Sequence, residues 1–196
     1  MPELVFPSDR VVGELDWLGA PIGGVPATGR VVVPDGVGVD LTVPGFSDSP
    51  DGGRLMNPAA DLGFLRELPP DGIEALRIRA APEASLDALA HLAPGLRRLY
   101  LIHTEFTDAA LPAIARLDGL VYLQAWGNAF TDAGVQQLVV LQNLESLYLE
   151  EETLTAAAFA FTDRLPRLAR LGLQDVNVTE AEIDDLRRRR PNVDVG

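Results

Sequence analysis

The stretch Leu96–Leu101, LRRLYL in one-letter code, decides the fold because its pattern returns every 24 residues. Later copies open at Leu120, Leu144 and Leu168, and a shorter unit opens at Ile73. A period of 20–29 residues around an LxxLxL core is typical of leucine-rich repeats, in which every repeat contributes one strand. The sequence therefore predicts an α/β fold built by stacking repeats.

Each repeat also carries a signal for the start of a helix. Eleven residues after the opening leucine stands a threonine, at Thr107, Thr131, Thr155 and Thr179. A threonine hydroxyl can accept a hydrogen bond from an N–H group of the first helical turn, which has no partner inside the helix. The apolar residues that follow recur at helical spacing. We therefore expect each repeat to read strand, loop, capped helix and short return, with a full capping box at Thr179–Glu182.

Two segments carry a family resemblance. Residues 107–111 (TDAAL) and 131–135 (TDAGV) resemble the TDAGL-type segment of bacterial leucine-rich-repeat proteins, similar to the ribonuclease-inhibitor-like class. The resemblance implies a right-handed solenoid with a parallel sheet on its concave face and helices on its convex face. It also implies recognition of other macromolecules, since the family shares no catalytic motif. Repeat four departs from the pattern at Ala156 and Thr162, where we expect Phe159 or Phe161 to fill the core.

Domain organisation follows from where the period begins. Residues 61–196 are predicted to form the solenoid, with about five repeats of ~24 residues and a first helix near residues 61–68. The helix of the next unit is expected at about Ser85–Leu92, and a last short strand at residues 190–195. Residues 1–60 lack the period and are predicted to form a β-rich cap over the apolar end of the stack.

Three features of the cap can be predicted in more detail. Residues 11–18 and 30–33 have β character, and residues 33–37 (VPDGV) favour a turn. Val37, Val39, Leu41 and Val43 alternate with smaller or polar residues, as in a half-buried strand. The segment of about residues 44–60 is rich in glycine, proline and polar residues, which predicts an exposed loop.

The composition gives little support for catalysis. The chain has no cysteine and only two histidines, His91 and His103, which are far apart in the sequence. Thiolate zinc sites and His-based triads are therefore not indicated, and we expect no enzyme activity, no cofactor and no metal. A second interpretation of the acidic residues Glu150–Glu152 and Asp175 is that they supply oxygen ligands to a hard cation. A solvated acidic loop is the favoured interpretation.

The charge and the hydropathy of the chain bear on its binding partners and on its location in the cell. The formal net charge is −13, which disfavours binding to a phosphate backbone. The basic run Arg187–Arg190 is expected to complement the dipole of the last helix. No stretch approaches the ~20 apolar residues of a membrane span. With no signal-peptide pattern in its first residues, the chain is predicted to be cytoplasmic.

The outward-facing residues of the predicted strands suggest a binding face. In the LxxLxL pattern, residues two, four and six places after the opening leucine point away from the core. These columns contain all three tyrosines and one of the two tryptophans. Tyrosine, tryptophan and arginine are enriched at binding hot spots. The predicted partner-binding residues are Arg77, Arg98, Tyr100, Ile102, Tyr122, Trp126 and Tyr148.

The predicted function is recognition of a protein or peptide by this concave patch, in a monomer or weak homo-oligomer. The competing interpretation of the tyrosines is that they suit a pleated surface and stack across strands. A second hypothesis is a self-associating scaffold that dimerises through a solenoid end or the β-cap. A third, less favoured one is an enzyme that uses the acidic loop and a metal.

Overall fold

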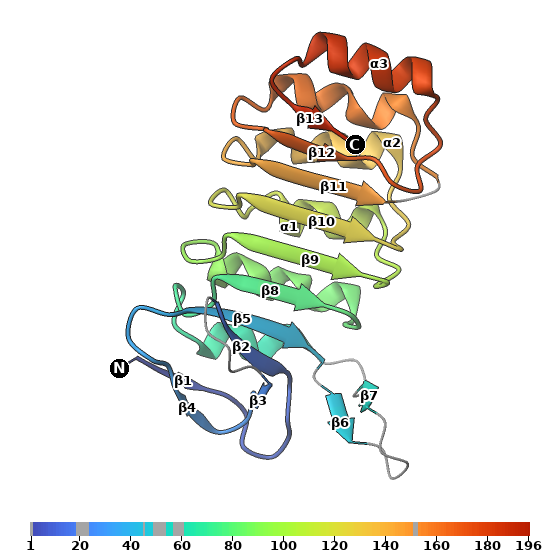
Figure 1. The fold of residues 1–196 in the computed structure, drawn as a ribbon. Helices are drawn as coiled ribbons and strands as arrows, with labels where there is room; N and C mark the ends of the chain where they lie inside the picture. Colours follow the sequence, from blue (N-terminus) through green and yellow to red (C-terminus); the bar gives the residue numbers. More distant parts are fainter. Residues whose placement is uncertain (1, 19–23, 45, 49–53, 57–60, 151–152) are drawn as a thin grey trace.

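Seven parallel strands form the backbone of the fold (Figure 1). The computed structural model describes residues 2–18, 24–44, 46–48, 54–56, 61–150 and 153–196. The strands are β5 (Gly38–Val43), β8 (Ala75–Ile78), β9 (Arg98–Ile102), β10 (Tyr122–Trp126), β11 (Ser146–Glu150), β12 (Arg170–Gly172) and β13 (Asp194–Val195). Equivalent leucines of successive strands lie in register, at Leu41, Leu76, Leu99, Leu123, Leu147 and Leu171.

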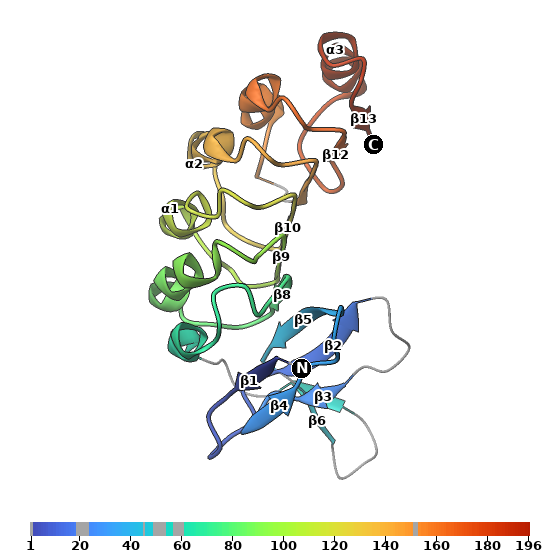
Figure 2. The same cartoon turned by 90° about the vertical axis from the view of Figure 1, so that its left-hand side faces the viewer.

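Helical segments line the opposite side of the stack (Figure 2). They are η1 (Leu62–Glu67), η2 (Glu83–Leu92), η3 (Asp108–Ala110), α1 (Leu111–Ile114), α2 (Asp132–Val135), η4 (Gln136–Val140), η5 (Ala156–Arg164) and α3 (Glu180–Arg189), where η marks 3-10 helix. The stack bends so that the sheet lies on its inner, concave side.

The type of helix differs from the α-helix expected in each repeat. Only α3 is a regular α-helix of ten residues, and the other convex segments are mainly 3-10 helix. A 3-10 helix rises about 2.0 Å per residue against about 1.5 Å in an α-helix, so it spans the outer side with fewer residues. η2 also begins at Glu83, two residues before the expected start, because Pro82 takes the extended conformation of an N-cap.

All four predicted threonine caps are confirmed. Thr107 and Thr155 accept from the second N–H after them, and Thr131 and Thr179 from the third. Thr179 also forms the expected capping box with Glu182.

An acidic ladder joins the caps of successive repeats. The Glu83 carboxylate accepts hydrogen bonds from the backbone N–H of Thr107 at 2.6 Å and from its hydroxyl at 3.0 Å. Asp108 binds Thr131 in the same way, at 2.9 and 2.6 Å. Asp132 binds Thr155 with the same two distances. The caps therefore hold each helix start and also tie neighbouring repeats together.

The interior is filled by the inward leucines and by three fully buried rings, Phe106, Phe130 and Phe159. Repeat four shows how the sequence exception is absorbed. Thr162 is fully buried, but its hydroxyl donates to the Phe159 carbonyl oxygen at 2.7 Å, so no polar group is left unpaired. Phe159 and Phe161 are both buried and fill the space together.

The N-terminal strands lie at one end of the stack (Figure 2). β1 (Glu3–Val5) pairs with β4 (Arg30–Val32), while β2 (Glu14–Leu18) joins β3 (Val25–Pro26) to β5. The expected turn is present at residues 35–36, but β4 and β5 do not pair with each other across it. β5 lies within the range assigned to the cap, yet it continues the parallel sheet of the repeats.

Two expectations for this region were wrong. The strand β5 is buried on both faces, since Asp40 and Thr42 are only 3% and 7% exposed. It lies between β2 and β8, so neither edge is free, and Arg77 covers and neutralises Asp40. The segment of residues 44–60 is not all loop, because β6 (Phe46–Asp48) pairs with β7 (Arg54–Met56) on either side of a turn-forming sequence. The exposure of this segment lies outside the described side chains.

Candidate functional site

The tyrosines lie on one face of the central strands because the side chains of a strand alternate. Tyr100 and Tyr148 stand at the same position of their repeats. In the sheet they are in register with Arg77, Gln124 and Gly172. Tyr122 lies two residues before Gln124 on the strand between them. Its ring therefore emerges on the same face and fits between the other two.

The rings contact one another across the strands. The Tyr100 and Tyr122 centroids are 4.9 Å apart, and the Tyr122 and Tyr148 centroids are 5.5 Å apart, with tilted planes. The Arg77 guanidinium carbon lies 4.0 Å from the Tyr100 centroid. We call Arg77, Tyr100, Tyr122 and Tyr148 the aromatic ladder. All four side chains are half-buried, so part of each remains accessible to solvent.

The ladder ends on a glycine. A Cβ atom placed on Gly172 would lie 2.1 Å from a ring carbon of Tyr148, so the ring rests directly on the β12 backbone. Gly172 is the residue of β12 in register with Tyr148. A larger residue there would push the ring away from the sheet, so the glycine determines the position of the Tyr148 ring.

At the other end, Asp40 holds Arg77. Both Nε and Nη2 of Arg77 donate to one carboxylate oxygen of Asp40, at 3.0 and 2.8 Å. Burial lowers the pKa of Arg77, but the hydrogen bond and charge of Asp40, together with Tyr100, outweigh burial and raise it above its ordinary value. The second oxygen of Asp40 is buried with no hydrogen-bond partner. The guanidinium is therefore fixed over Tyr100 by a carboxylate that has little alternative contact.

The middle of the ladder is linked to acidic groups. The Tyr122 hydroxyl donates to the Gln124 side-chain oxygen at 3.2 Å. Burial, followed by the charges of Tyr100, Tyr148 and Glu150, raises the pKa of Tyr122 to about 12. Burial and the charge of Asp175 raise the pKa of Glu150, although a hydrogen bond from Gln124 opposes them. Gln124 thus bridges the tyrosines to a pair of neighbouring carboxylates.

A small cavity lies beside the ladder, at the carboxyl ends of β9 to β12. Its volume is about 330 Å³, and its lining is His103, Trp126, Gly127, Asn128, Glu150, Thr153 and Asp175. The rings of His103 and Trp126 are 4.3 Å apart. Trp126 is 39% exposed, which is high for a large apolar side chain.

The turn next to this cavity has left-handed backbone at a repeated position. His103, Gly127 and Asp175 have φ of 52°, 67° and 52°, and they are one to three 24-residue periods apart. Glycine adopts this conformation freely, and histidine and aspartate do so more often than most residues. The conformation therefore belongs to the repeat and is not by itself a sign of a reactive site.

The seven predicted residues fall into three groups. Four of them form the aromatic ladder. Trp126 packs against His103, while Ile102 is its half-buried neighbour in register on β9. Arg98 pairs with Glu74 at 3.3 Å, at the start of its strand.

Asp40 contacts Arg77, His103 contacts Trp126 and Gln124 contacts Tyr122, but the sequence did not predict these three as binding residues. Gln124 stands in an outward column, so its position was readable from the period. Asp40 and His103 were not, because one lies outside the period and the other one residue past a strand. Two other residues at outward-facing positions of the repeat, Ala75 and Ser146, are buried and contribute nothing to the surface.

The acidic loop has a limited role in the described structure. Glu150 and Asp175 line the same small cavity, and the charge of Asp175 acts on Glu150, while Glu151 and Glu152 lie outside the described residues. Among the residues that the structure describes, no group of three histidine, aspartate or glutamate side chains is arranged to hold a metal ion.

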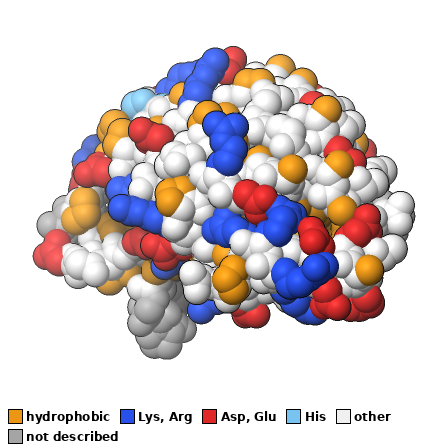
Figure 3. All heavy atoms as spheres, turned by 90° about the horizontal axis from the view of Figure 1, so that it is seen from above, with side chains coloured by type: hydrophobic (Ala, Val, Ile, Leu, Met, Phe, Trp, Pro, Cys, Tyr) orange, Lys and Arg blue, Asp and Glu red, His pale blue; other side chains and the backbone are white. Residues whose placement is uncertain are grey.

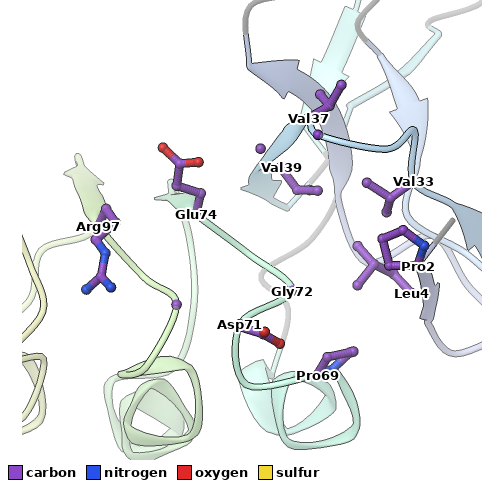
Figure 4. Close-up of a pocket in the computed structure, with 13 residues that line it drawn as sticks. Pro2, Leu4, Val33, Val37, Val39, Pro69, Asp71, Gly72, Glu74 and Arg97 are labelled. Carbon is purple, nitrogen blue, oxygen red and sulfur yellow. The ribbon is translucent and has the colours of Figure 1, made fainter.

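A second cavity, of about 560 Å³, lies where the N-terminal strands meet the first repeats (Figure 4). One wall is apolar, with Leu4, Val33 and Val39, and the facing wall carries Glu74 and Arg97. The guanidinium of Arg97 donates to the carbonyl oxygens of Gly119 and Pro94, at 3.0 and 3.2 Å, and Glu74 pairs with Arg98. Glu74 and Arg97 are thus already engaged within the chain, and Asp71 is a third charged residue of the lining.

The basic run at the end of the chain is mixed with carboxylates (Figure 3). Arg187 pairs with Asp184, and Arg188 and Arg189 both pair with Asp185. Figure 3, which looks onto the end of the stack that carries α3, shows blue and red side chains interleaved. The four arginines therefore do not form a continuous positive surface.

Across the described part of the chain, no helix is long and apolar enough to cross a membrane.

Comparison with known proteins gives structural likeness only. No protein-family model and no curated protein matches the chain. A leucine-rich-repeat protein of Leptospira interrogans aligns with 63% of this chain and 30% of its own, at 21% identity and a TM-score of 0.43. An internalin (InlF) of Listeria monocytogenes aligns with 71% and 45%, at 19% identity and a TM-score of 0.49. Internalin C2 of the same organism aligns with 71% and 67%, at 19% identity and a TM-score of 0.42. The chain spans less than half the length of the first two.

Proposed function

We propose that this chain is a non-catalytic leucine-rich-repeat module that holds a protein or peptide on its concave sheet. The observation that carries the proposal is the aromatic ladder, an unbroken row of one arginine and three tyrosines that contact one another across β8 to β11. Partly exposed aromatic and arginine side chains in contiguous rows are the residues that carry most of the energy at protein interfaces.

Preorganisation supports a binding role over simple strand stacking. Stacking alone accounts for the contacts between rings, which contribute about 0.5–1.5 kcal/mol per pair. It does not account for the arginine at the end, which is fixed by a nearly buried carboxylate and still reaches solvent. Rigid side chains lose little conformational entropy when a partner binds, which favours affinity.

The extent of the face suits one standard protein interface. The ladder and its continuation cross β8 to β12, and neighbouring strands lie about 4.8 Å apart. A standard interface buries ~800 Å² on each partner. The tyrosines would supply the centre of such an interface, with the flanking polar residues as its rim.

The test is affinity capture from the native host with three baits. They are the wild-type chain, the variant Tyr100→Ala/Tyr122→Ala/Tyr148→Ala, and a control altered on the convex side, Gln137→Ala/Val140→Ala. Val140 is 52% exposed, so the control also removes an exposed apolar side chain. We expect a protein that is retained by the wild type and the control but lost from the ladder variant.

The ladder variant must be shown to fold, because its rings also pack on one another. Far-UV circular dichroism and a cooperative thermal transition provide that check, and the triple Tyr→Phe variant keeps the stack while removing the hydroxyl groups. Equal capture by wild type and a folded alanine variant would remove the proposal.

A second candidate is self-association through the N-terminal strands. Val5 and Val32 are each 47% exposed on the outer face of the β1–β4 pair. Two exposed valines on a two-stranded sheet are a small patch, yet sheets with open edges are prone to pair with another copy. Sedimentation velocity over a hundredfold range of concentration decides this: a monomer at every concentration eliminates it.

A further inference from the structure

The cavity beside the aromatic ladder combines an aromatic wall with two carboxylates. Glu150 ends β11, and Asp175 lies in the loop after β12. Trp126, whose ring packs against that of His103, supplies the aromatic side, and Asn128 and Thr153 complete the lining with side chains that are hydrogen-bonded within the chain. Its volume of about 330 Å³ lies at the small end of ligand cavities, which suits one side chain.

The two carboxylates lack a counter-charge within the described residues. Two arginines of the neighbouring strands are engaged elsewhere, Arg77 with Asp40 and Arg98 with Glu74. The charge of Asp175 helps to raise the pKa of Glu150, which shows that the two groups repel each other. A cation placed between them would relieve this repulsion.

The aromatic wall selects the kind of cation. Calcium bound by proteins takes roughly six to eight oxygen ligands, whereas only two carboxylates line this cavity among the residues that the structure describes. The face of an indole ring, in contrast, attracts ammonium and guanidinium groups within about 6 Å. Trp126 is partly exposed at the cavity, so an entering side chain can reach it.

We propose that this cavity binds the side-chain cation of a lysine or arginine residue of the partner. Trp126 would lie against the cation, and Glu150 and Asp175 would neutralise it. The inference rests on the proposed function, because it assigns one anchor residue to a partner held on the neighbouring ladder. It adds that the partner presents a basic residue at the carboxyl-end edge of the sheet.

The experiment uses the whole chain labelled with ¹⁵N on its two tryptophan indoles. Capped tripeptides with a central lysine, arginine or norleucine between glycines are titrated, and the indole N–H signals of Trp126 and Trp17 are followed by NMR. We expect saturable movement of the Trp126 signal with the lysine or arginine peptide. The Trp17 signal, from β2 at the far end of the sheet, is expected to stay in place.

The variants Glu150→Gln and Asp175→Asn, singly and together, test the counter-charges. We expect the double variant to weaken binding about 3- to 10-fold, as the sizes of exposed ion-pair and cation–π contacts indicate. Glu67→Gln/Asp118→Asn removes the same charge from two exposed residues away from the cavity, so its affinity should match the wild type. If the double variant does not fold, Asp175→Asn alone gives the readout, since Asp175 is exposed.

Two results would overturn the inference. One is a Trp126 signal that norleucine moves as much as lysine and arginine do, or that none of them moves. The other is an affinity for the basic peptides that the cavity variants leave unchanged. Neither result removes the proposed function, which depends on capture by the tyrosines and not on this cavity.

Discussion

Single residues of the concave face behave as parts of one row. Asp40 holds Arg77, Arg77 covers Tyr100, and Tyr122 joins Tyr100 to Tyr148. Each side chain is placed by the one before it, so substitutions should show coupling between neighbours.

Tyr122 should ionise at a higher pH than an ordinary tyrosine side chain. Burial and neighbouring negative charges raise its pKa to about 12, against an ordinary 10.0. Because the folded state favours the neutral phenol, its contribution to stability is full below pH ~10 and is lost as the pH rises towards about 12. A spectrophotometric titration at the tyrosinate band checks this. The step near pH 12 should disappear in Tyr122→Phe, and the absence of such a step from the wild type would contradict the burial argument.

Arg77 should be worth more to the fold than Asp40. Arg77→Met leaves the almost buried Asp40 carboxylate without its partner, and we expect a loss of about 3 kcal/mol in the free energy of unfolding. Asp40→Asn should be milder, since the Arg77 side chain is 33% exposed and can turn to water. The double variant should lose less than the sum of the two single losses.

Urea denaturation measures this cycle, with Arg116→Met as the matched control. Arg116 also pairs with an aspartate, Asp87, but both side chains are largely exposed. Its replacement should change stability by less than about 1 kcal/mol. Equal losses for Arg77→Met and Arg116→Met would show that burial of Asp40 does not matter.

At the scale of elements, the acidic ladder explains why the last helix is capped differently from the helices of the earlier repeats. Glu83, Asp108 and Asp132 each bind the threonine cap of the following repeat. Repeat four has Ala156 in place of the acid, so Thr179 receives its carboxylate from Glu182 within its own helix. A local capping box therefore replaces a link between repeats.

This substitution can be reversed. Glu182→Ala should lower the melting temperature, because the Thr179 N–H loses its acceptor at 2.9 Å. Adding Ala156→Asp should restore part of the loss, since residue 156 stands to Thr179 as Asp132 stands to Thr155. Differential scanning calorimetry of both variants gives the answer. Ala156→Ser is the control, and a rescue by serine equal to that by aspartate would refute the ladder.

The hydrogen bonds of Thr179 lower the pKa of Glu182, which sets a pH dependence for the same comparison. A carboxylate whose pKa is lowered by folding contributes stability above its unfolded pKa and loses it as the pH falls through the folded value. The difference between wild type and Glu182→Ala should therefore shrink in acid.

The element types show what periodicity can and cannot predict. The strands, their register and the four caps follow from leucine and threonine spacing, and all are present. The preference for 3-10 over α-helix does not follow, because apolar spacing is similar in both and the choice depends on the span to be covered. The full burial of β5 was not predicted for a related reason: its residues Asp40 and Thr42 look solvent-facing until the fold places Arg77 over Asp40.

For the whole molecule, the sequence predicts which tyrosines share a face of the sheet, but it does not predict the contacts at the ends of that face. The tyrosines share the concave face because they stand in columns of a repeat, which is a local property of the chain. The pairing of Asp40 with Arg77 joins residues 37 positions apart across the start of the period. The His103 and Trp126 contact depends on a turn conformation that strand spacing does not specify.

The measurement that bears most directly on the concave face is the affinity of the captured partner for the ladder variant. Isothermal titration calorimetry with purified partner compares wild type, Tyr100→Ala/Tyr122→Ala/Tyr148→Ala and the convex-side control. Loss of hot-spot residues at the centre of an interface predicts at least roughly tenfold weaker binding for the ladder variant. The control should bind like the wild type. An unchanged dissociation constant in a ladder variant that remains folded would contradict the account.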